Sequence, residues 1–191
     1  MPEKPNVDTY DPEDLKGEDN LVRQSQENPE AFGPLFDFYG PRVYRYILHR
    51  VGNVSDAEDL TSRTFTDALQ SLSRYRAKRN GSFGGWLFTI ARRRCADHFR
   101  GSNPLPLEDF DLKDTAAGPL EEVISQDDQQ RLKEILVSLK EKDLELLRLR
   151  FAAELTYRQI GDVLGKSEGA AKMSLVRLVN NMRNLWEGID G

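Results

Sequence analysis

Apolar residues recur every three or four positions along most of the chain, which is the spacing of amphipathic helices. The first such stripe runs from Ala31 to Val51, in a helical block that begins near Asp19 or Asn28. Gly40-Pro41 interrupts the stripe and predicts a kink or a break, and Gly52-Asn53 is a typical helix stop. We find no stretch with the strict alternation of a β-strand. The pattern therefore predicts an all-α protein.

Two more helices are expected before residue 101. Ser55 is placed to cap the first of them, with Glu58 three residues later completing a capping box. Residues 73–82 contain no aliphatic side chain larger than alanine and read as a basic loop. Phe83 to Arg100 is then expected to form the next helix.

Two segments differ from the helical pattern in composition. Residues 1–18 place three prolines among acidic residues and predict a disordered acidic tail. Residues 101–120 place three prolines and two glycines among acids and predict a flexible acidic linker. The sequence therefore predicts two small helical modules, over residues 19–100 and 121–187.

The second module ends in a predicted helix-turn-helix. It is preceded by helices expected at about 120–139 and 141–152. Thr156 caps a short helix that reaches Leu164, and Gly165 supplies the turn. Ser167 caps a last helix that runs to about Trp186. Its buried stripe is predicted to be Ala171, Leu175, Leu178, Met182 and Leu185.

The opposite face of this last helix carries Gly169, Met173, Val176 and Asn180, flanked by Lys172 and Arg177. Small, polar and basic groups on an exposed helix suit insertion into the major groove of DNA. The same geometry is also that of an ordinary helical hairpin within an all-α domain.

Charge is distributed unevenly along the chain. The 191 residues include 27 Lys and Arg against 32 Asp and Glu, a net charge of −5, which taken whole argues against nucleic-acid binding. Residues 74–100, however, hold 8 basic residues and 1 acidic one. Residues 101–130 hold 8 acidic residues and 1 basic one. A strongly basic segment is thus followed directly by a strongly acidic one.

Aromatic residues are interleaved with this cationic segment. Basic side chains contact phosphates and aromatic rings stack on unpaired bases, so the mixture favours a nucleic-acid partner. The alternative interpretation is that Phe83, Trp86 and Phe88 belong to the core while the arginines form a solvated face.

The sequence lacks the residue sets that catalysis or metal binding would require. Cys95 is the single cysteine, His49 and His98 are isolated, and no nucleophile stands with a base and an orienting group. We therefore expect no enzyme, no metal, no cofactor and no small-molecule substrate. No long apolar run and no apolar leader segment are present, so we expect a cytoplasmic protein without membrane insertion.

Three stretches carry a resemblance to a known family. They are SDAEDLTSRTFTDAL at 55–69, FGGWLFTIARRRCADHFR at 83–100, and LTYRQIGDVLGKSEGAAKMSLVRLVNNMR at 155–183. In this order they resemble regions 2.2, 2.3–2.4 and 4.2 of bacterial RNA polymerase sigma factors of the extracytoplasmic-function group, within the sigma-70 family.

This resemblance implies a sigma factor that binds core RNA polymerase and recognises the −35 and melts the −10 element of promoter DNA. The positions implied for polymerase binding are Asp56, Glu58, Asp59, Leu60 and Phe65. The positions implied for the −10 element, some of them in a loop that captures a flipped base, are Arg74, Tyr75, Arg76, Lys78, Arg79, Asn80, Arg92, Arg93 and Arg94. The positions implied for the −35 element are Lys166, Ser167, Gly169, Ala170, Lys172, Met173, Val176 and Arg177.

Two departures from the family pattern stand out. Arg93 replaces the usual Asn, and unlike Asn it donates hydrogen bonds but accepts none. Ser62-Arg63 replaces the usual Gln-Glu. Many members of the group are held inactive by an anti-sigma factor, and the sequence leaves open whether this chain has one. A stand-alone helix-turn-helix regulator and an all-α enzyme or scaffold remain the competing hypotheses.

Overall fold

The computed structural model describes residues 15–77, 81–101 and 126–188. These residues form helices and contain no β-strand, which confirms the all-α prediction. The first four helices, joined in part by a 3₁₀ helix over Pro29–Phe32, are α1 (Glu18–Glu27), α2 (Gly33–Val51), α3 (Val54–Leu72) and α4 (Phe83–Gly101). The remaining helices are α5 (Gln126–Ser138), α6 (Glu141–Leu147), a π-helical segment (Arg148–Ala152), α7 (Tyr157–Leu164) and α8 (Glu168–Gly188).

Helices α1 to α4 pack around aromatic rings. The ring of Phe32 lies 6.3 Å from that of Phe65 on α3 and 6.2 Å from that of Phe83 on α4. Phe32 is the last residue of the 3₁₀ helix, directly before α2, and on α2 itself the ring of Tyr46 lies 5.5 Å from that of Phe88 on α4. Edge-on ring contacts of this kind stabilise a core beyond the area they bury. They join α2, α3 and α4 into one bundle.

Helix α2 runs unbroken through Gly40-Pro41, so the sequence signal for a break does not split it. Pro41 is exposed on the helix surface. The helix ends at Val51, directly before Gly52-Asn53, as the sequence predicts.

The cap of α3 differs from the prediction. Asn53, not Ser55, is the N-cap, and its Oδ1 accepts a 2.8 Å hydrogen bond from the backbone N–H of Asp56. The helix begins at Val54, so Ser55 already lies inside its first turn. An Asn directly after a glycine stop can cap as well as Ser, and here it comes two residues earlier.

The predicted helix-turn-helix is present as α7 and α8. Thr156 caps α7 in a reciprocal capping box with Gln159. Gly165 ends α7 with φ 66°, a left-handed conformation that favours glycine. The hydroxyl of Ser167 accepts a hydrogen bond from the N–H of Ala170 at 3.2 Å and so caps α8.

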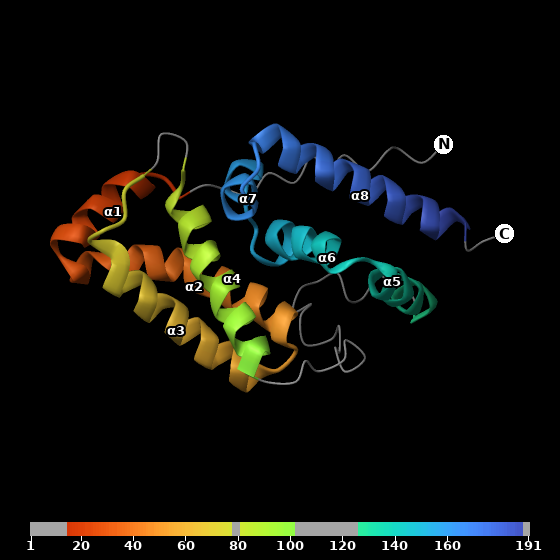
Figure 1. The fold of residues 1–191 in the computed structure, drawn as a ribbon, viewed down its shortest axis with the longest axis horizontal. Coiled ribbons are helices and arrows are strands. Elements are labelled where there is room, and N and C mark those ends of the chain that lie inside the picture. The colour runs from red at the N-terminus through yellow and green to blue at the C-terminus, as the bar shows by residue number, and fades with distance from the viewer. Residues whose placement is uncertain (1–14, 78–80, 102–125, 189–191) are drawn as a thin grey trace.

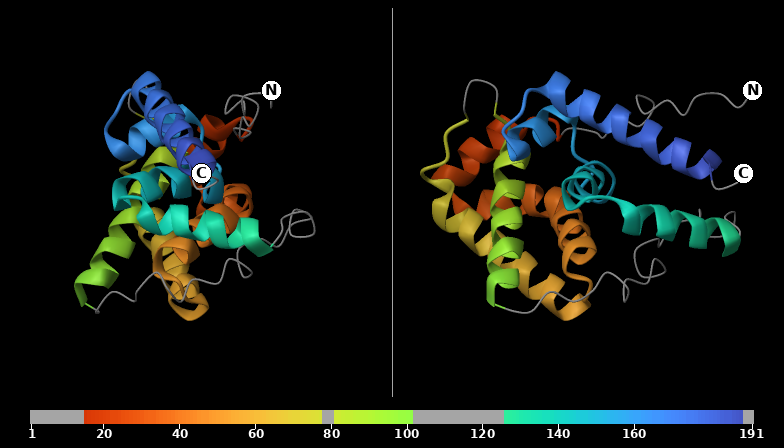
Figure 2. Two further views of the ribbon diagram at one scale, coloured as in Figure 1. Left: turned by 90° about the vertical axis from the view of Figure 1, so that its right-hand side faces the viewer. Right: turned by 45° about the vertical axis from the view of Figure 1, so that its right-hand side comes forward.

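The buried stripe of α8 is confirmed over its N-terminal half and wrong at its end. Ala171, Leu175 and Leu178 are buried, whereas Leu185 is 38% exposed. Trp186 lies on the side toward α5, where the guanidinium of Arg131 is 5.2 Å from its ring centre. Helices α5 and α8 are in contact, and their far ends extend beyond the rest of the molecule (Figure 2).

The two halves of the chain share one hydrophobic core. Leu149, Leu155 and Ile160 are buried in the same cluster as Tyr39 and Tyr46 of α2. The π-helical segment packs on α2, and α7 packs on α4 (Figure 1). The sequence predicted two modules and did not predict how they pack together. The expected tail over 1–18 lies mostly outside the described residues, and α1 begins at its last position. The expected linker over 101–120 lies outside them after residue 101.

Candidate nucleic-acid and polymerase interfaces

The N-terminal half of α8 presents most of the positions expected to read DNA. Lys166, Ser167, Gly169, Ala170 and Arg177 are exposed, and Met173 is 50% exposed. Lys172 and Val176 are half-buried, and the ammonium of Lys172 lies 5.8 Å from the centre of the Tyr157 ring. The structure therefore divides this set into an exposed face and two half-buried positions, of which Lys172 lies against Tyr157 of α7.

The three consecutive arginines of α4 have different surroundings. Arg93 is 82% exposed, with Asp97 on the next turn at 3.9 Å. Arg94 forms a two-pronged ion pair with Asp67 of α3, and these hydrogen bonds raise its pKa. Arg92 reaches instead toward α6, with its Nε 3.2 Å from Oε1 of Glu145. Arg93 is the most exposed of the three, Arg92 is 47% exposed, and Arg94 is 35% exposed.

The basic loop before α4 is partly folded onto the core. Arg74 and Arg76 are exposed, and the guanidinium of Arg76 donates to the carbonyls of Ser73 and Tyr75 at 2.8 Å. The ring of Tyr75 packs 4.8 Å from that of Trp86. Lys78, Arg79 and Asn80 lie outside the described residues.

Burial governs the chemistry of Tyr75. Burial, with added repulsion from the carboxylate of Glu18, raises the pKa of its phenol to about 12. Phe83 and Phe88 are fully buried, which confirms the core interpretation for these two rings. The aromatic members of the segment thus brace α4, while the exposed charged members near them are basic.

The positions expected to bind polymerase include both exposed acidic side chains and buried apolar ones. Glu58 and Asp59 are exposed on α3, and Asp59 pairs with Arg63 one turn later, with the shortest contact at 2.9 Å. Leu60 and Phe65 are each 4% exposed, so they support the helix from inside the core.

Asp56 is held locally at the start of α3. Its carboxylate accepts a 2.6 Å hydrogen bond from the Asn53 amide, and the imidazole of His98 lies 3.5 Å away. Phe36 was not among the positions expected to bind polymerase; it is an apolar ring that is 49% exposed and packs 4.8 Å from Phe65. Its only signal in the sequence was its membership of an apolar stripe.

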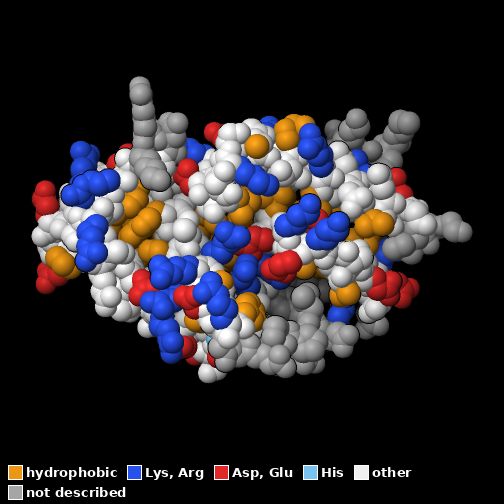
Figure 3. Space-filling model, in the orientation of Figure 1, with side chains coloured by type: hydrophobic (Ala, Val, Ile, Leu, Met, Phe, Trp, Pro, Cys, Tyr) orange, Lys and Arg blue, Asp and Glu red, His pale blue; other side chains and the backbone are white. Residues whose placement is uncertain are grey.

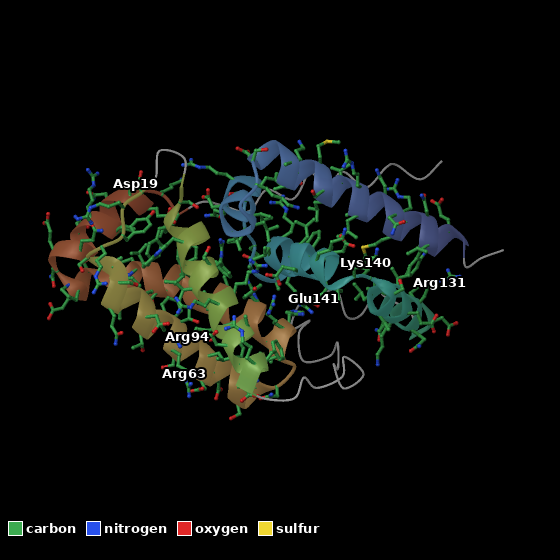
Figure 4. All side chains as sticks on the ribbon, viewed as in Figure 1. Asp19, Arg63, Arg94, Arg131, Lys140 and Glu141 are labelled. Atoms are coloured by element: carbon green, nitrogen blue, oxygen red, sulfur yellow. The ribbon has the colours of Figure 1, made fainter. Side chains whose placement is uncertain are left out.

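The face of the molecule seen in Figure 3 carries many basic side chains. They lie over α3 and α4 and along the boundary between the two halves of the chain, with acidic side chains among them. Arg63 and Arg94 lie on the α3–α4 side (Figure 4). Among the described residues no group of three or more His, Cys, Asp or Glu could hold a metal ion. None of the described helices is long and apolar enough to cross a membrane.

Comparison with known proteins identifies the two halves. The family model for sigma-70 region 2 matches residues 35–104, and the model for sigma-70 region 4 matches residues 135–184. The ECF RNA polymerase sigma factor ShbA of Streptomyces griseus is 31% identical over 180 residues, which cover 87% of this chain and 94% of ShbA. This chain is an extracytoplasmic-function sigma factor of the sigma-70 family.

A second sigma factor is also similar over most of this chain. BldN of Streptomyces coelicolor, an ECF RNA polymerase sigma factor, is 36% identical over 170 residues, which cover 86% of this chain. The match spans 64% of the length of BldN.

Two solved structures share the fold of this sigma factor. CnrH, in complex with the cytosolic domain of CnrY, superposes with a TM-score of 0.62 at 20% identity, over 90% of this chain and 97% of that one. The sigma factor RpoE of Bartonella quintana, in complex with the anti-sigma factor NepR, gives 0.55 at 21% identity, over 83% and 98% of the two chains.

In this sigma factor the boundary between region 2 and region 4 is built around a buried carboxylate. Glu145 of α6 is 4% exposed, and its Oε1 accepts a 2.9 Å hydrogen bond from the phenol of Tyr46. Its other oxygen forms a close ion pair with Arg50, and Arg92 approaches from α4. Three side chains of region 2 therefore converge on one acid of region 4. No sequence motif pointed to this cluster.

A second set of polar contacts lies beside the first. The guanidinium of Arg45 donates to the Ala152 carbonyl at 3.2 Å and to Oε1 of Glu154 at 2.5 Å. Arg148 of region 4 donates to the carbonyl of His49 at 3.1 Å. Burial, followed by the nearby charges of Arg148 and Arg45, lowers the pKa of His49 to about 4.

Proposed function

We propose that this chain is the promoter-specificity subunit of a bacterial RNA polymerase. In this role region 4 recognises the −35 element, region 2 holds the melted −10 element, and the bound core enzyme makes the RNA. The observation that carries the proposal is the presence of regions 2 and 4 in that order on one chain, at residues 35–104 and 135–184. The exposed basic and small side chains found on each region support it.

Helix α8 is proposed to read the −35 element in the major groove. Its N-terminal half offers Arg177 for bidentate contact with a guanine or for a phosphate. The apolar Met173 beside it suits contact with a thymine methyl group. The small residues Gly169 and Ala170 allow the helix to approach the bases closely.

Region 2 is proposed to hold the unpaired −10 strand. Flipping a base out of the stack costs a few kcal/mol, which contacts to the strand must offset. Arg74, Arg76 and Arg93 are exposed and suit phosphate contacts along such a strand. Arg92 and Arg94 are paired with carboxylates and would contribute only after exchanging those partners.

The exposed acids of α3 are proposed to contact core polymerase. Glu58 and Asp59 carry the charge, and Leu60 and Phe65 keep the helix in place from the core. A protein with these partners works in the cytoplasm and needs no catalytic residues of its own. An anti-sigma factor is a further partner that we propose for this chain, as for other members of the group.

Equilibrium binding to purified core RNA polymerase, followed by co-elution from a sizing column, tests the proposal. The full chain is expected to bind core, and Glu58→Lys with Asp59→Lys is expected to weaken binding at least tenfold. Glu30→Lys, an exposed change outside this surface, is the matched control. If the chain does not bind core polymerase yet binds duplex DNA tightly, the competing hypothesis of a stand-alone regulator is favoured.

A further inference from the structure

Helix α1 lies against both ends of the basic loop, residues 73–82. This helix precedes the segment matched to sigma-70 region 2, which begins at residue 35. Val22 of α1 is 4% exposed and belongs to the shared hydrophobic core, and the helix packs against α2 and α4 (Figure 1). The position of α1 is therefore fixed by the core, and its polar side chains are available to fix what lies beside them.

The side-chain amide of Gln26 joins α1 to the beginning of the basic loop. Its Nε2 donates to the carbonyl of Leu72 at 2.9 Å and to the carbonyl of Tyr75 at 2.8 Å. Leu72 is the last residue of α3, where backbone carbonyls have no partner within the helix. A primary amide nitrogen carries two N–H donors, one for each of these carbonyls. Gln26 thus fixes the path of the chain as it leaves α3.

The carbonyl of Tyr75 is shared with a residue expected to contact the −10 element. The exposed guanidinium of Arg76 donates to this same oxygen and to the carbonyl of Ser73, both at 2.8 Å. Gln26 and Arg76 therefore meet at one carbonyl oxygen. A change at Gln26 is transmitted to the position of Arg76 through this part of the backbone.

Glu18, at the start of α1, reaches the other end of the basic loop. Its Oε2 accepts a hydrogen bond from the backbone N–H of Phe83 at 3.3 Å, and its Oε1 accepts one from the phenol of Tyr39. Phe83 is the first residue of α4, so its N–H has no acceptor within that helix. A carboxylate is also favoured there by the positive end of the helix dipole. Glu18 therefore caps α4 from a different helix.

The two ends of the basic loop are also close to each other. The ring of Tyr75 lies 5.9 Å from that of Phe83. Gln26 holds the Tyr75 side and Glu18 holds the Phe83 side, so one helix fixes both ends. Ordering a loop when it binds a ligand costs conformational entropy, and fixing the loop beforehand reduces that cost. Helix α1 thus pre-organises the basic loop.

Resting on the proposed function, we infer that Gln26 and Glu18 are positioning residues for recognition of the −10 element. In this role they hold the two ends of the loop that captures the flipped base, without contacting the base. Unstacking a base costs free energy that contacts to it must offset, and a pre-organised loop offsets more of it. Loss of either side chain should weaken recognition of the captured base and leave binding to core polymerase unchanged.

Substitutions of Gln26, made in the full chain and assembled with core polymerase, test the inference. Gln26→Glu keeps the shape of the side chain but places a carboxylate, which only accepts hydrogen bonds, opposite two carbonyls. Gln26→Met keeps the length and removes the donors without adding charge. Gln24→Glu is the matched control, because it makes the same chemical change at an exposed position of the same helix.

The probe is a pool of 20-nucleotide single-stranded DNA, randomised at its central positions. Strands bound by each holoenzyme are sequenced, and the preference for each base at each aligned position is compared. The wild type and Gln24→Glu should enrich the same sequence. Both Gln26 variants should lower the preference at one position by about fivefold, the equilibrium effect of one ordinary hydrogen bond. Glu18→Ala should lower the preference at that same position.

A chain that is merely less stable would reduce the amount of active holoenzyme and not the ratio of bases at one position. Unchanged preferences in both Gln26 variants, or an equal loss at every position, would overturn the inference. A loss in Gln26→Glu alone would also overturn it, because that result indicates repulsion between the new carboxylate and DNA. So would losses at different positions for the Gln26 and Glu18 variants.

Failure of the proposed function gives a different result. In that case the wild-type chain either does not bind core polymerase or enriches no sequence when bound to it, and the inference falls with the proposed function. Enrichment by the wild type with unchanged preferences in the Gln26 variants contradicts the positioning role alone.

Discussion

The phenol of Tyr46 donates a hydrogen bond to the carboxylate of Glu145 across 99 positions of the sequence, at 2.9 Å. Burial, followed by the negative charge of Glu145, holds the pKa of this phenol well above its ordinary value. The phenol therefore stays protonated and keeps donating. This bond joins α2 of region 2 to α6 of region 4 inside the shared core.

Removing the charge of Glu145 should lower the free energy of unfolding. In Glu145→Gln the guanidinium of Arg50, whose side chain is 14% exposed, loses its closest anion, and breaking a buried pair typically costs about 3–5 kcal/mol. We expect a lower midpoint in urea denaturation, as measured by circular dichroism. Glu141→Gln is the control, because Glu141 is 60% exposed and its pairs with Arg148 and Arg50 should contribute at most about 1 kcal/mol. Equal losses in the two variants would contradict the assignment.

The N-cap of α3 provides a test between the residue expected from the sequence, Ser55, and the residue seen in the structure, Asn53. Asn53→Ala should lower the free energy of unfolding by about 1 kcal/mol, because the N–H of Asp56 loses its acceptor. Ser55→Ala should change it by less than about 0.5 kcal/mol, since Ser55 is exposed within the first turn. Urea denaturation of both variants measures the two values. The reverse order would restore Ser55 as the cap.

His49 should make the folded chain sensitive to mild acid. Its pKa is about 4 in the folded chain and 6.5 when unperturbed, so between these values the unfolded chain binds more protons and stability falls as the pH drops. From pH 7 to pH 5 the loss from this one group is about 2 kcal/mol.

His49→Gln, which does not titrate, provides the comparison. The difference in unfolding free energy between wild type and variant, measured at both pH values, isolates the histidine from the carboxylates. Parallel curves for the two proteins would mean that His49 titrates normally.

The single thiol should be inert in the folded chain. Burial raises the pKa of Cys95 to about 12, so almost no thiolate is present near neutral pH. Alkylation by iodoacetamide should be slow in buffer and fast in denaturing urea, as followed by mass spectrometry. Rapid labelling of the native protein would place Cys95 nearer the surface than the structure does.

Local sequence signals predicted the local structure well. Thr156, Gly165 and Ser167 cap and terminate α7 and α8 as predicted, because caps and turns depend on neighbouring residues. The same reasoning chose Ser55 over Asn53, since both residue types cap helices and the spacing to Glu58 fitted only one. It also placed Leu185 in the buried stripe, because helical period alone does not show where a covering element ends.

Contacts between distant residues lay beyond such reasoning. The packing of Asp162 on Gly85 and of Glu145 on Tyr46 joins positions that no local pattern connects. The two glycines in FGGW and the buried acid of α6 were visible in the sequence as residues. Their meaning depends on the partner that each one meets.

Promoter-specific initiation is tested most directly by mapping the 5′ ends of RNA made in vitro by purified core polymerase on fragmented genomic DNA of the source organism, with and without this chain. The proposal predicts discrete 5′ ends that need the chain and share one sequence near −35 and another near −10. The same 5′ ends from core alone, or no new ones when the chain is added, would contradict it.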